Sequence, residues 1–442
     1  MDLPLYLDVP FIGLLLSIAL IPLLSPKFWH QHYGKVSLFW SILCLAGLLC
    51  TGGVEFTSSQ VAHTLFEEYL PFLILLISLY VISGGILITG DVRGSPAWNT
   101  GVLALGSCAA SIVGTTGASM ILIRPLIRAN IGRLHNAHVI VFFILTVSNI
   151  GGSLSPLGDP PLFLGFLQGV NFFWTTTHLL PHTTLMLGVL LLVFYFIDCF
   201  VYKLDNVYIN LEPNGNRSIG IVGKANLVLL AVVVGSVLMS GLWDPQITYS
   251  VFGAKLSLQG IVRDVLLLIA SLISLVITDA NIRRKNGFTS EPMKEVAKLF
   301  CGIFITIIPI LHQLREGPNG IFGPLISLTR DPSTGQFVDA IFFWLTGILS
   351  SFLDNAPTYL VFFNIAGGDP VLLQTQMAST LAAISAGAVF MGANTYIGNA
   401  PNFMVKAIAE EQGIAMPSFF GYMAWSFGIL TPLFILLTFV FF

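Results

Sequence analysis

Long apolar runs, each near 20 residues, follow one another along the whole chain and are separated by short polar segments. A run of this length is what a helix needs to cross the hydrocarbon core of a bilayer. The pattern therefore predicts an all-α polytopic membrane protein with ten spans and two re-entrant helical hairpins. The predicted spans are residues 9–24, 36–49, 69–88, 138–167, 182–201, 225–242, 265–277, 296–311, 372–408 and 420–441, and the hairpins are residues 100–127 and 338–365.

Two of these spans are interrupted by glycine, proline and polar residues. The first interruption runs from Ser148-Asn149 to Gly158-Asp159-Pro160-Pro161, and the second from Asn394-Thr395 to Gly398-Asn399-Ala400-Pro401-Asn402. Glycine and proline end a helix and free backbone carbonyls and amides. At membrane depth such backbone survives only when it is buried in protein or lines a wet cavity. One proline would indicate a simple kink, but two matched clusters indicate a site formed by broken helices.

The order of elements, three spans, a hairpin, a broken span and a further span, occurs twice. We therefore expect two repeats, residues 1–202 and 225–442, joined by a polar linker at 203–224. If the N-terminus faces outward, all Lys and Arg residues except Lys255, Arg263, Arg315 and Arg330 fall on the inner side, as the positive-inside rule requires. The two repeats are then inverted. We expect the protein to lie in the cell inner membrane, with both termini on the outer side and the linker on the cytoplasmic side.

The composition supports lipid as the solvent of this chain. Only 9% of the residues are charged and 55% are hydrophobic, whereas a soluble protein carries about a quarter charged residues. The five cysteines form no metal-spacing motif. We expect no cofactor and no nucleic-acid partner.

Asp159 and Asp354 are the main candidates for the chemistry of the site. A carboxylate in the hydrocarbon zone costs about 2.5 kcal/mol or more, so its presence indicates a function. Burial favours the protonated carboxyl group and a nearby sodium ion favours the ionised one. Proton and sodium can therefore compete for one group, which is the minimal chemistry of an antiporter. The alternative is that either aspartate only caps a half-helix, and the two roles can coexist.

Neutral oxygens near these aspartates complete the expected site. Sodium prefers hard oxygen ligands, as calcium and magnesium do. The tip of each hairpin is expected to meet the broken span of its own half. The expected sodium ligands are Asn149, Asp159, Asp354 and Asn394, and the further candidates for ion or substrate binding are Ser148, Ser153, Gly158, Asn355, Thr358, Thr395, Gly398, Asn399 and Asn402.

At these motifs the chain resembles the ion transporter superfamily, in its branch of NhaD-type sodium/proton antiporters and citrate transporters, which is related to arsenite permeases and divalent anion/sodium symporters. The resemblance implies a homodimer in which the hairpins and broken spans move against a scaffold. The dicarboxylate branch carries paired Ser-Asn-Thr motifs. Here the first reads Ser148-Asn149-Ile150 and the second Ala393-Asn394-Thr395, so neither is complete, and the two aspartates favour cation/proton exchange.

The leading hypothesis is therefore a sodium/proton antiporter, with sodium as the transported or coupling ion. A sodium- or proton-coupled symporter of citrate or another small carboxylate is the alternative, and an arsenite exporter comes third. An enzyme with two intramembrane aspartates would be an intramembrane aspartyl protease. Such a protease would need the motif Gly-X-Gly-Asp, whereas this chain has Pro156-Leu157-Gly158-Asp159. We therefore expect that the protein is not an enzyme.

Overall fold

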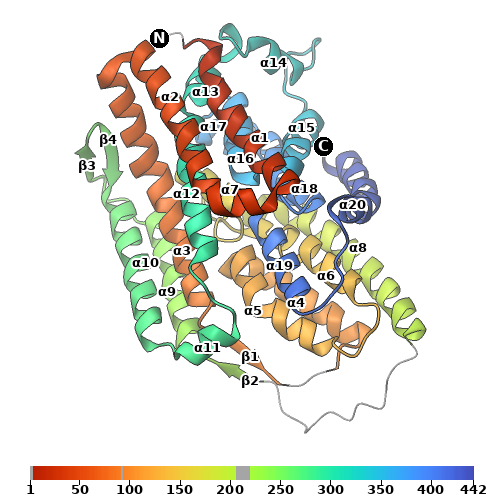
Figure 1. The fold of residues 1–442 in the computed structure, drawn as a ribbon. Helices are drawn as coiled ribbons and strands as arrows, with labels where there is room; N and C mark the ends of the chain where they lie inside the picture. Colours follow the sequence, from red (N-terminus) through yellow and green to blue (C-terminus); the bar gives the residue numbers. More distant parts are fainter. Residues whose placement is uncertain (1–2, 91–92, 206–219) are drawn as a thin grey trace.

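The computed structural model describes residues 3–90, 93–205 and 220–442. Long helices stand side by side and account for nearly all of the regular structure (Figure 1). In the first half these are α1 (Val9–Leu24), α2 (Pro26–His63), α3 (Leu70–Ser83), α4 (Pro96–Val113), α5 (Thr115–Ala129), α6 (Ala137–Thr146), α7 (Pro160–Leu167) and α8 (Trp174–Leu204). Two short helical segments, η1 (Leu5–Asp8) and the π-helical η2 (Thr64–Tyr69), precede α1 and α3.

The second half repeats this order with additional short helices. It contains α9 (Ala225–Leu242), α10 (Leu258–Ile277), α11 (Ala280–Lys285), α12 (Glu291–Thr306), α13 (Ile308–Arg315), α14 (Gly323–Leu328), α15 (Asp339–Phe352), α16 (Asn355–Ile365), α17 (Pro370–Thr375), α18 (Ala378–Met391), α19 (Ala400–Glu411) and α20 (Phe419–Phe441). The all-α polytopic fold class is confirmed. The only paired strands among the described residues are β1 (Leu87–Thr89) with β2 (Gly220–Val222) and β3 (Thr248–Val251) with β4 (Ala254–Ser257).

Eight helical segments of the described chain are long and apolar enough to cross a membrane. One of them, Pro26–Ser83, has 58 residues, which is about twice the length that one crossing needs. It turns back at Gly53, whose φ of 72° is a left-handed value that glycine tolerates best. This segment therefore supplies the second and third predicted spans, and the shorter α18 with α19 supplies the interrupted one near the end.

Several predicted boundaries needed correction. The second span extends well beyond 36–49, because α2 continues through the polar residues that follow Pro26. The third predicted span, 69–88, ends early: α3 stops at Ser83 and Leu87 already belongs to β1. Most of the predicted linker, residues 206–219, lies outside the described residues, and its ends belong to α8 and β2.

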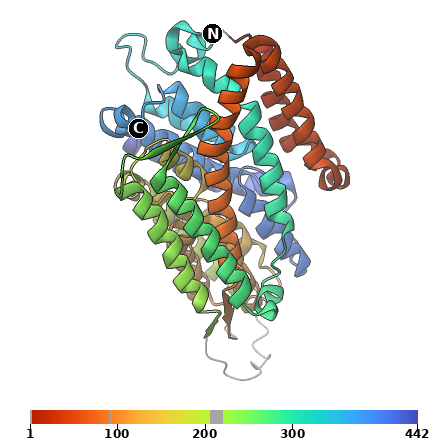
Figure 2. The same ribbon diagram turned by 90° about the vertical axis from the view of Figure 1, so that its left-hand side faces the viewer.

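The second and third spans of each half pack against spans of the other half in the same pattern. The second span of the first half, α2, packs against α12, and the third span, α3, packs against α10 (Figures 1 and 2). Each half thus places its second span on the third span of the other half. A two-fold relation between the halves would produce such an exchange, and the inverted repeats stay a prediction.

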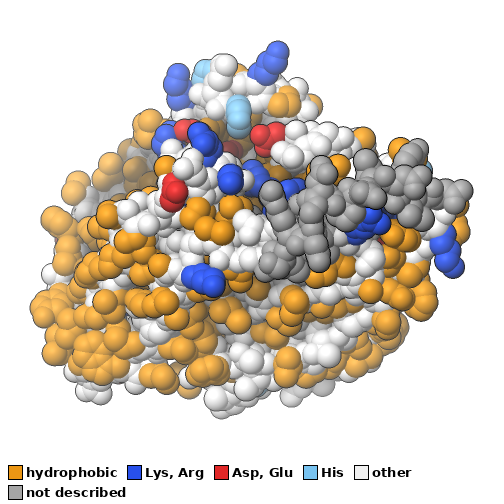
Figure 3. Space-filling view, turned by 90° about the horizontal axis from the view of Figure 1, so that it is seen from below, with side chains coloured by type: hydrophobic (Ala, Val, Ile, Leu, Met, Phe, Trp, Pro, Cys, Tyr) orange, Lys and Arg blue, Asp and Glu red, His pale blue; other side chains and the backbone are white. Residues whose placement is uncertain are grey.

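The outer surface of the bundle has the character of a lipid-facing surface. Only 22% of the most apolar window of α8 is buried inside the protein, and α10 and α20 are similarly exposed. Both termini lie in the upper half of Figure 1, whereas β1, β2 and α11 lie at the bottom. Seen from below, Lys and Arg side chains gather on this bottom face (Figure 3). This distribution supports the predicted inner placement of the bottom face, which stays a prediction.

Candidate functional site

The two broken spans cross in the interior with their breaks side by side. In the first, α6 ends at Thr146, a 3-10 turn η3 (Ile150–Leu154) follows, and α7 begins at Pro160. In the second, α18 is followed by η5 (Gly392–Asn394) and α19 begins at Ala400. The helix breaks are confirmed, but they are shorter than predicted, because Pro160, Pro161 and Pro401 lie in the first helical turn, where the missing N–H costs nothing.

Asp159 lies at the centre of this crossing. It is the N-cap residue of α7 and only 1% exposed. Its Oδ1 accepts hydrogen bonds from Thr115 Oγ1 at 3.0 Å and from Asn399 Nδ2 at 3.1 Å, and its Oδ2 accepts one from Asn355 Nδ2 at 2.5 Å. None of these three donors is charged. The carboxyl group is therefore held by neutral donors from the first hairpin tip, the second hairpin tip and the second broken span.

These donors occupy equivalent positions in the two halves. Ser155 Oγ donates to the Ser111 carbonyl and Thr395 Oγ1 donates to the Ser351 carbonyl, and each pair is 44 residues apart. The second pair lies 240 residues after the first, and the same 240 residues separate Asp159 from its donor Asn399. Thr115 and Asn355 obey the same spacing. The carboxyl group of Asp159 is therefore held by residues of both halves, at the place where the two halves meet.

Close backbone contacts shape both breaks in the same way. A side chain at Gly158 would overlap the carbonyl of Gly152, and one at Gly398 would lie 2.5 Å from the carbonyl oxygen of Gly392. The Thr115 amide also donates to the Gly158 carbonyl at 2.8 Å. The first hairpin tip thus meets the broken span of its own half, as expected. The predicted site residues Gly158 and Gly398 contribute through their backbone.

The tip of the second hairpin and the second broken span each carry a side-chain amide oxygen without a hydrogen-bond donor among the described residues. Asn394 Nδ2 donates to Ser351 Oγ at 2.9 Å. The side-chain oxygens of Asn355 and Asn394 are buried and have no hydrogen-bond partner among the described residues. A buried amide oxygen without a donor costs free energy unless a cation or water completes it. These two oxygens therefore fit a hard cation.

Asn149 and Asn402 join the two broken spans directly. Asn149 Nδ2 donates to Asn402 Oδ1 at 2.6 Å, and Asn399 Nδ2 donates to the carbonyl of Ser148 at 3.3 Å. A side-chain carbon built on Gly392 would have Gly398 O, Asn149 Oδ1 and Ser350 Oγ within 3.5 Å. Oxygens from both broken spans and the second hairpin therefore converge at this glycine.

Three predicted residues lie apart from the Asp159 cluster. Asp354 is half-buried and caps α16, since its Oδ1 accepts from the Ala356 amide at 3.0 Å. Thr358 Oγ1 bonds to the carbonyl of Asp354 within the same helix. Ser153 Oγ contacts Thr183 Oγ1 of α8 at 2.6 Å. The capping role considered for Asp354 is therefore observed, and Asp354 does not bond to Asp159.

A cavity of about 70 Å³ connects the two aspartates. The tip of the first hairpin, both broken spans and Asp354 line one wall, and apolar side chains of α3 and α12 line the other. Among its lining residues there is no Lys, Arg or His. The cavity is large enough for several waters or a small ion, and its only ionisable carboxyl groups are Asp159 and Asp354.

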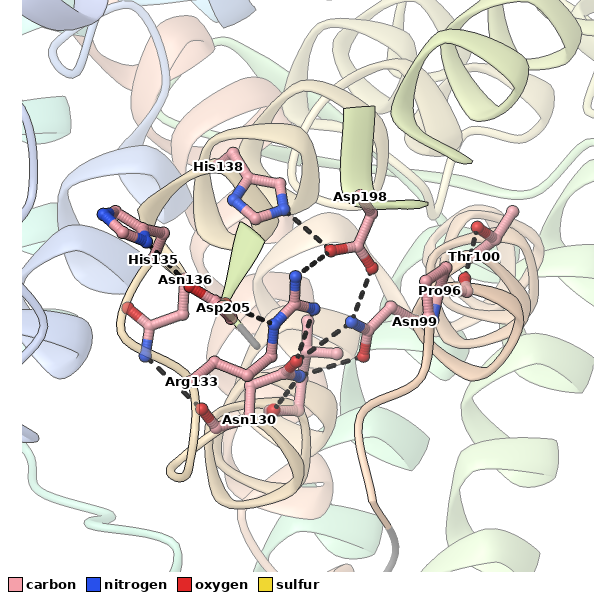
Figure 4. Close-up of polar contacts among 11 residues, drawn as sticks. Pro96, Asn99, Thr100, Asn130, Arg133, His135, Asn136, His138, Asp198 and Asp205 are labelled. Carbon is pink, nitrogen blue, oxygen red and sulfur yellow. Dashed lines mark hydrogen bonds and ion pairs between the residues drawn. The ribbon is translucent and has the colours of Figure 1, made fainter. Parts of the chain in front are cut away.

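A buried polar network fixes the base of the first hairpin (Figure 4). Arg133 Nη2 lies 2.5 Å from Asp198 Oδ1, and His138 Nε2 lies 2.8 Å from the same oxygen. Asn99 of α4 bonds to Asp198 at 2.9 Å and to Asn130 at 3.0 Å. Both arms of the hairpin and the start of the first broken span are thereby tied to α8.

Sequence reasoning missed Thr115, although its hairpin tip was expected to meet the broken span. The signal that identifies it is the constant spacing, which makes Thr115 the counterpart of the predicted Asn355. The pairing of Asn149 with Asn394 is not the one the structure shows. At the same spacing the counterpart of Asn149 is Val389, and that of Asn394 is Leu154.

A search of curated proteins found no match for this chain. A family model described as "Putative citrate transport" matches residues 1–442, which is the whole chain. With its membrane-spanning helices and broken-helix site, the chain thus belongs to this family of secondary transporters.

Proposed function

We propose that this protein exchanges sodium for protons across the membrane and that Asp159 is the group for which the two ions compete. The observation that carries the proposal is a fully buried carboxyl group with three neutral donors and no cationic partner among the described residues. The donors favour the ionised form and the burial favours the protonated form. Such a group exchanges a proton for a metal cation with little change in its surroundings.

The sodium ion would bind close to Asp159 on oxygens that the protein leaves free. The side-chain oxygens of Asn355 and Asn394 are buried without donors, and the oxygens around Gly392 add further ligands. Asp354 lines the same cavity and would be the second proton-binding carboxyl group. If two protons leave as one sodium ion enters, each cycle moves one net charge across the membrane. The free energy of exchange then depends on the membrane potential, by about 2.3 kcal/mol for each charge and each 100 mV.

Citrate uptake is the second candidate, and the family match favours it. A citrate anion would enter a cavity whose described lining offers two carboxyl groups and no basic side chain. Like charges brought together in a low dielectric repel strongly. Citrate would therefore be carried together with cations that neutralise it, and the protein would act as a cation-coupled symporter.

We further propose that the protein lies in the cell inner membrane with both termini outside and works as a homodimer. The proposal on orientation is supported by the Lys and Arg side chains of the bottom face (Figure 3). The proposal on dimers rests on the family resemblance. Labelling of single cysteines from each side and crosslinking in the membrane test the two points separately.

Purified protein in liposomes with an enclosed pH dye tests the function. We expect an imposed sodium gradient to drive protons the opposite way without citrate, and Asp159→Asn to abolish this movement. Because protons compete for the same group, lowering the pH should raise the apparent KM for sodium without lowering the maximal rate. Movement only when citrate is present would replace exchange by symport, and unchanged exchange in Asp159→Asn would refute the assigned site.

A further inference from the structure

A further buried carboxyl group, that of Glu68, lies outside the site described so far. It belongs to the π-helical turn η2 and is only 4% exposed. Its Oε1 accepts a hydrogen bond from Gln168 Nε2 at 2.9 Å, while its Oε2 is buried and has no hydrogen-bond partner among the described residues. A buried ionised carboxylate with a free oxygen is costly, and π-helical turns occur frequently at functional sites.

Glu68 continues the face of α3 that lines the cavity. Phe72, Leu75, Leu76, Leu79 and Tyr80 line it, at the spacing of one helix face. Glu68 precedes Phe72 by four residues. Its partner Gln168 directly follows α7, whose Phe163 lines the opposite wall. The Glu68–Gln168 contact therefore lies one helical turn beyond Phe72, at the end of α3 that lies away from the bottom face of Figure 1.

We infer that Glu68 is a further proton-binding residue of the transport cycle, besides Asp159 and Asp354, and that its protonated form keeps this end of the cavity closed. The contact joins a helix of one wall to the broken span of the other, so it breaks when the two walls separate. Water then reaches Glu68, which releases its proton to the side of the termini. This extends the proposed function, since it assigns a proton-linked step to a residue that does not bind the sodium ion.

The charged neighbours of Glu68 are few. His63 and Glu67 form an ion pair at 3.5 Å on the same side of the molecule, and the backbone amide of Lys255 on β4 donates to Glu67. The positive charge of Arg315 on α13 interacts electrostatically with Glu68. The Arg315 guanidinium donates a hydrogen bond to Asn364 of α16 at 3.5 Å. On α12, Lys298 is directed to the Tyr33 ring. None of these groups donates a hydrogen bond to the free oxygen of Glu68.

Accessibility of the cavity at different pH values tests the inference. A cysteine replaces Leu75 in a variant without the native cysteines, and a membrane-impermeant maleimide is applied from the side of the termini. We expect faster labelling as the pH rises, because an ionised carboxylate is costly in a buried place and draws in water, which separates Glu68 from Gln168. Glu68→Gln should lose this pH dependence, whereas Glu67→Gln, the same change at the neighbouring residue, should keep it.

The readout does not depend on which ion the protein carries, so it separates this inference from sodium/proton exchange. Gln168→Glu brings a second carboxyl group to Glu68, and we expect it to increase labelling at high pH. Thermal melting in detergent checks that each variant is folded. The inference would be overturned if labelling of Glu68→Gln still depended on pH, or if labelling of the parent did not. Either result would count even if sodium/proton exchange is observed.

Discussion

Asn399 Nδ2 donates a hydrogen bond to Asp159 Oδ1 at 3.1 Å, and these two residues occupy equivalent positions 240 residues apart. Both are N-cap residues with extended backbone, at the starts of α7 and α19. Two N-caps that touch bring two helix N-termini, each with partial positive charge, to one point. One carboxyl group and one amide share that point, so the site is asymmetric in charge although the two N-cap residues have nearly the same backbone conformation.

Exchanging the two side chains tests this relation. Asp159→Asn should abolish cation-dependent proton movement, because no titrating group remains at the crossing. The double variant Asp159→Asn with Asn399→Asp returns one carboxyl group to the equivalent position, and we expect part of the activity to return. Exchange rates in liposomes provide the measurement. A double variant as inactive as the single one would show that the two positions are not interchangeable.

The hydroxyl of Thr115 should matter for cation affinity. Thr115→Val keeps the shape and the backbone contact with Gly158 but removes a donor to Asp159. A hydrogen bond to a charged group contributes about 1.5–3 kcal/mol, so we expect roughly tenfold to hundredfold weaker apparent sodium affinity. Thr115→Ser retains a hydroxyl and serves as the control. Equal sodium affinities in the two variants would exclude this role.

The sequence located the two helix breaks because the signals that end a helix are local. Gly158, Pro160, Gly398 and Pro401 act through their own backbone, so their positions could be read without knowing the fold. The sequence could not show that Asn399 and Asn355 of one half would bond to Asp159 of the other. That contact depends on how the halves pack, and apolar runs alone do not specify the packing.

The same limit applies to other residues of the site. Asp354 and Ser153 have the right chemistry for an ion site, but the sequence could not show that one oxygen of Asp354 caps α16 or that the Ser153 hydroxyl contacts Thr183. Thr115 was missed because a threonine in an apolar hairpin is unremarkable by itself. Its role appears only when its spacing to Asn355 is compared with the spacing of Ser111 to Ser351.

Close packing of the broken spans predicts a stability effect at Gly158. A methyl group there would overlap the backbone carbonyl of Gly152, which cannot move aside as a flexible side chain could. We expect Gly158→Ala to lower the melting temperature in detergent, by a free energy of about 1–3 kcal/mol or more. Gly101→Ala on α4, where nothing lies within 4 Å of an added carbon, should leave it unchanged or raise it. Equal melting temperatures for the two variants would contradict the observed contact.

The network at the base of the first hairpin predicts a larger effect for Arg133. This guanidinium is buried between Asp198 and Asp205 and is their common cation (Figure 4). Removing one partner of a buried ion pair leaves an uncompensated charge and costs about 3–5 kcal/mol. We therefore expect Arg133→Met to lower the melting temperature strongly. Arg128→Met is the same change at an exposed position on α5, whose guanidinium bonds only to the Ile88 carbonyl among the contacts described. This control variant should have little effect on the melting temperature.

Combining Arg133→Met with Asp198→Asn and Asp205→Asn removes the unpaired charges, so this triple variant should regain part of the lost stability. If it melts below Arg133→Met, the network stabilises the hairpin through its hydrogen bonds and not through charge balance.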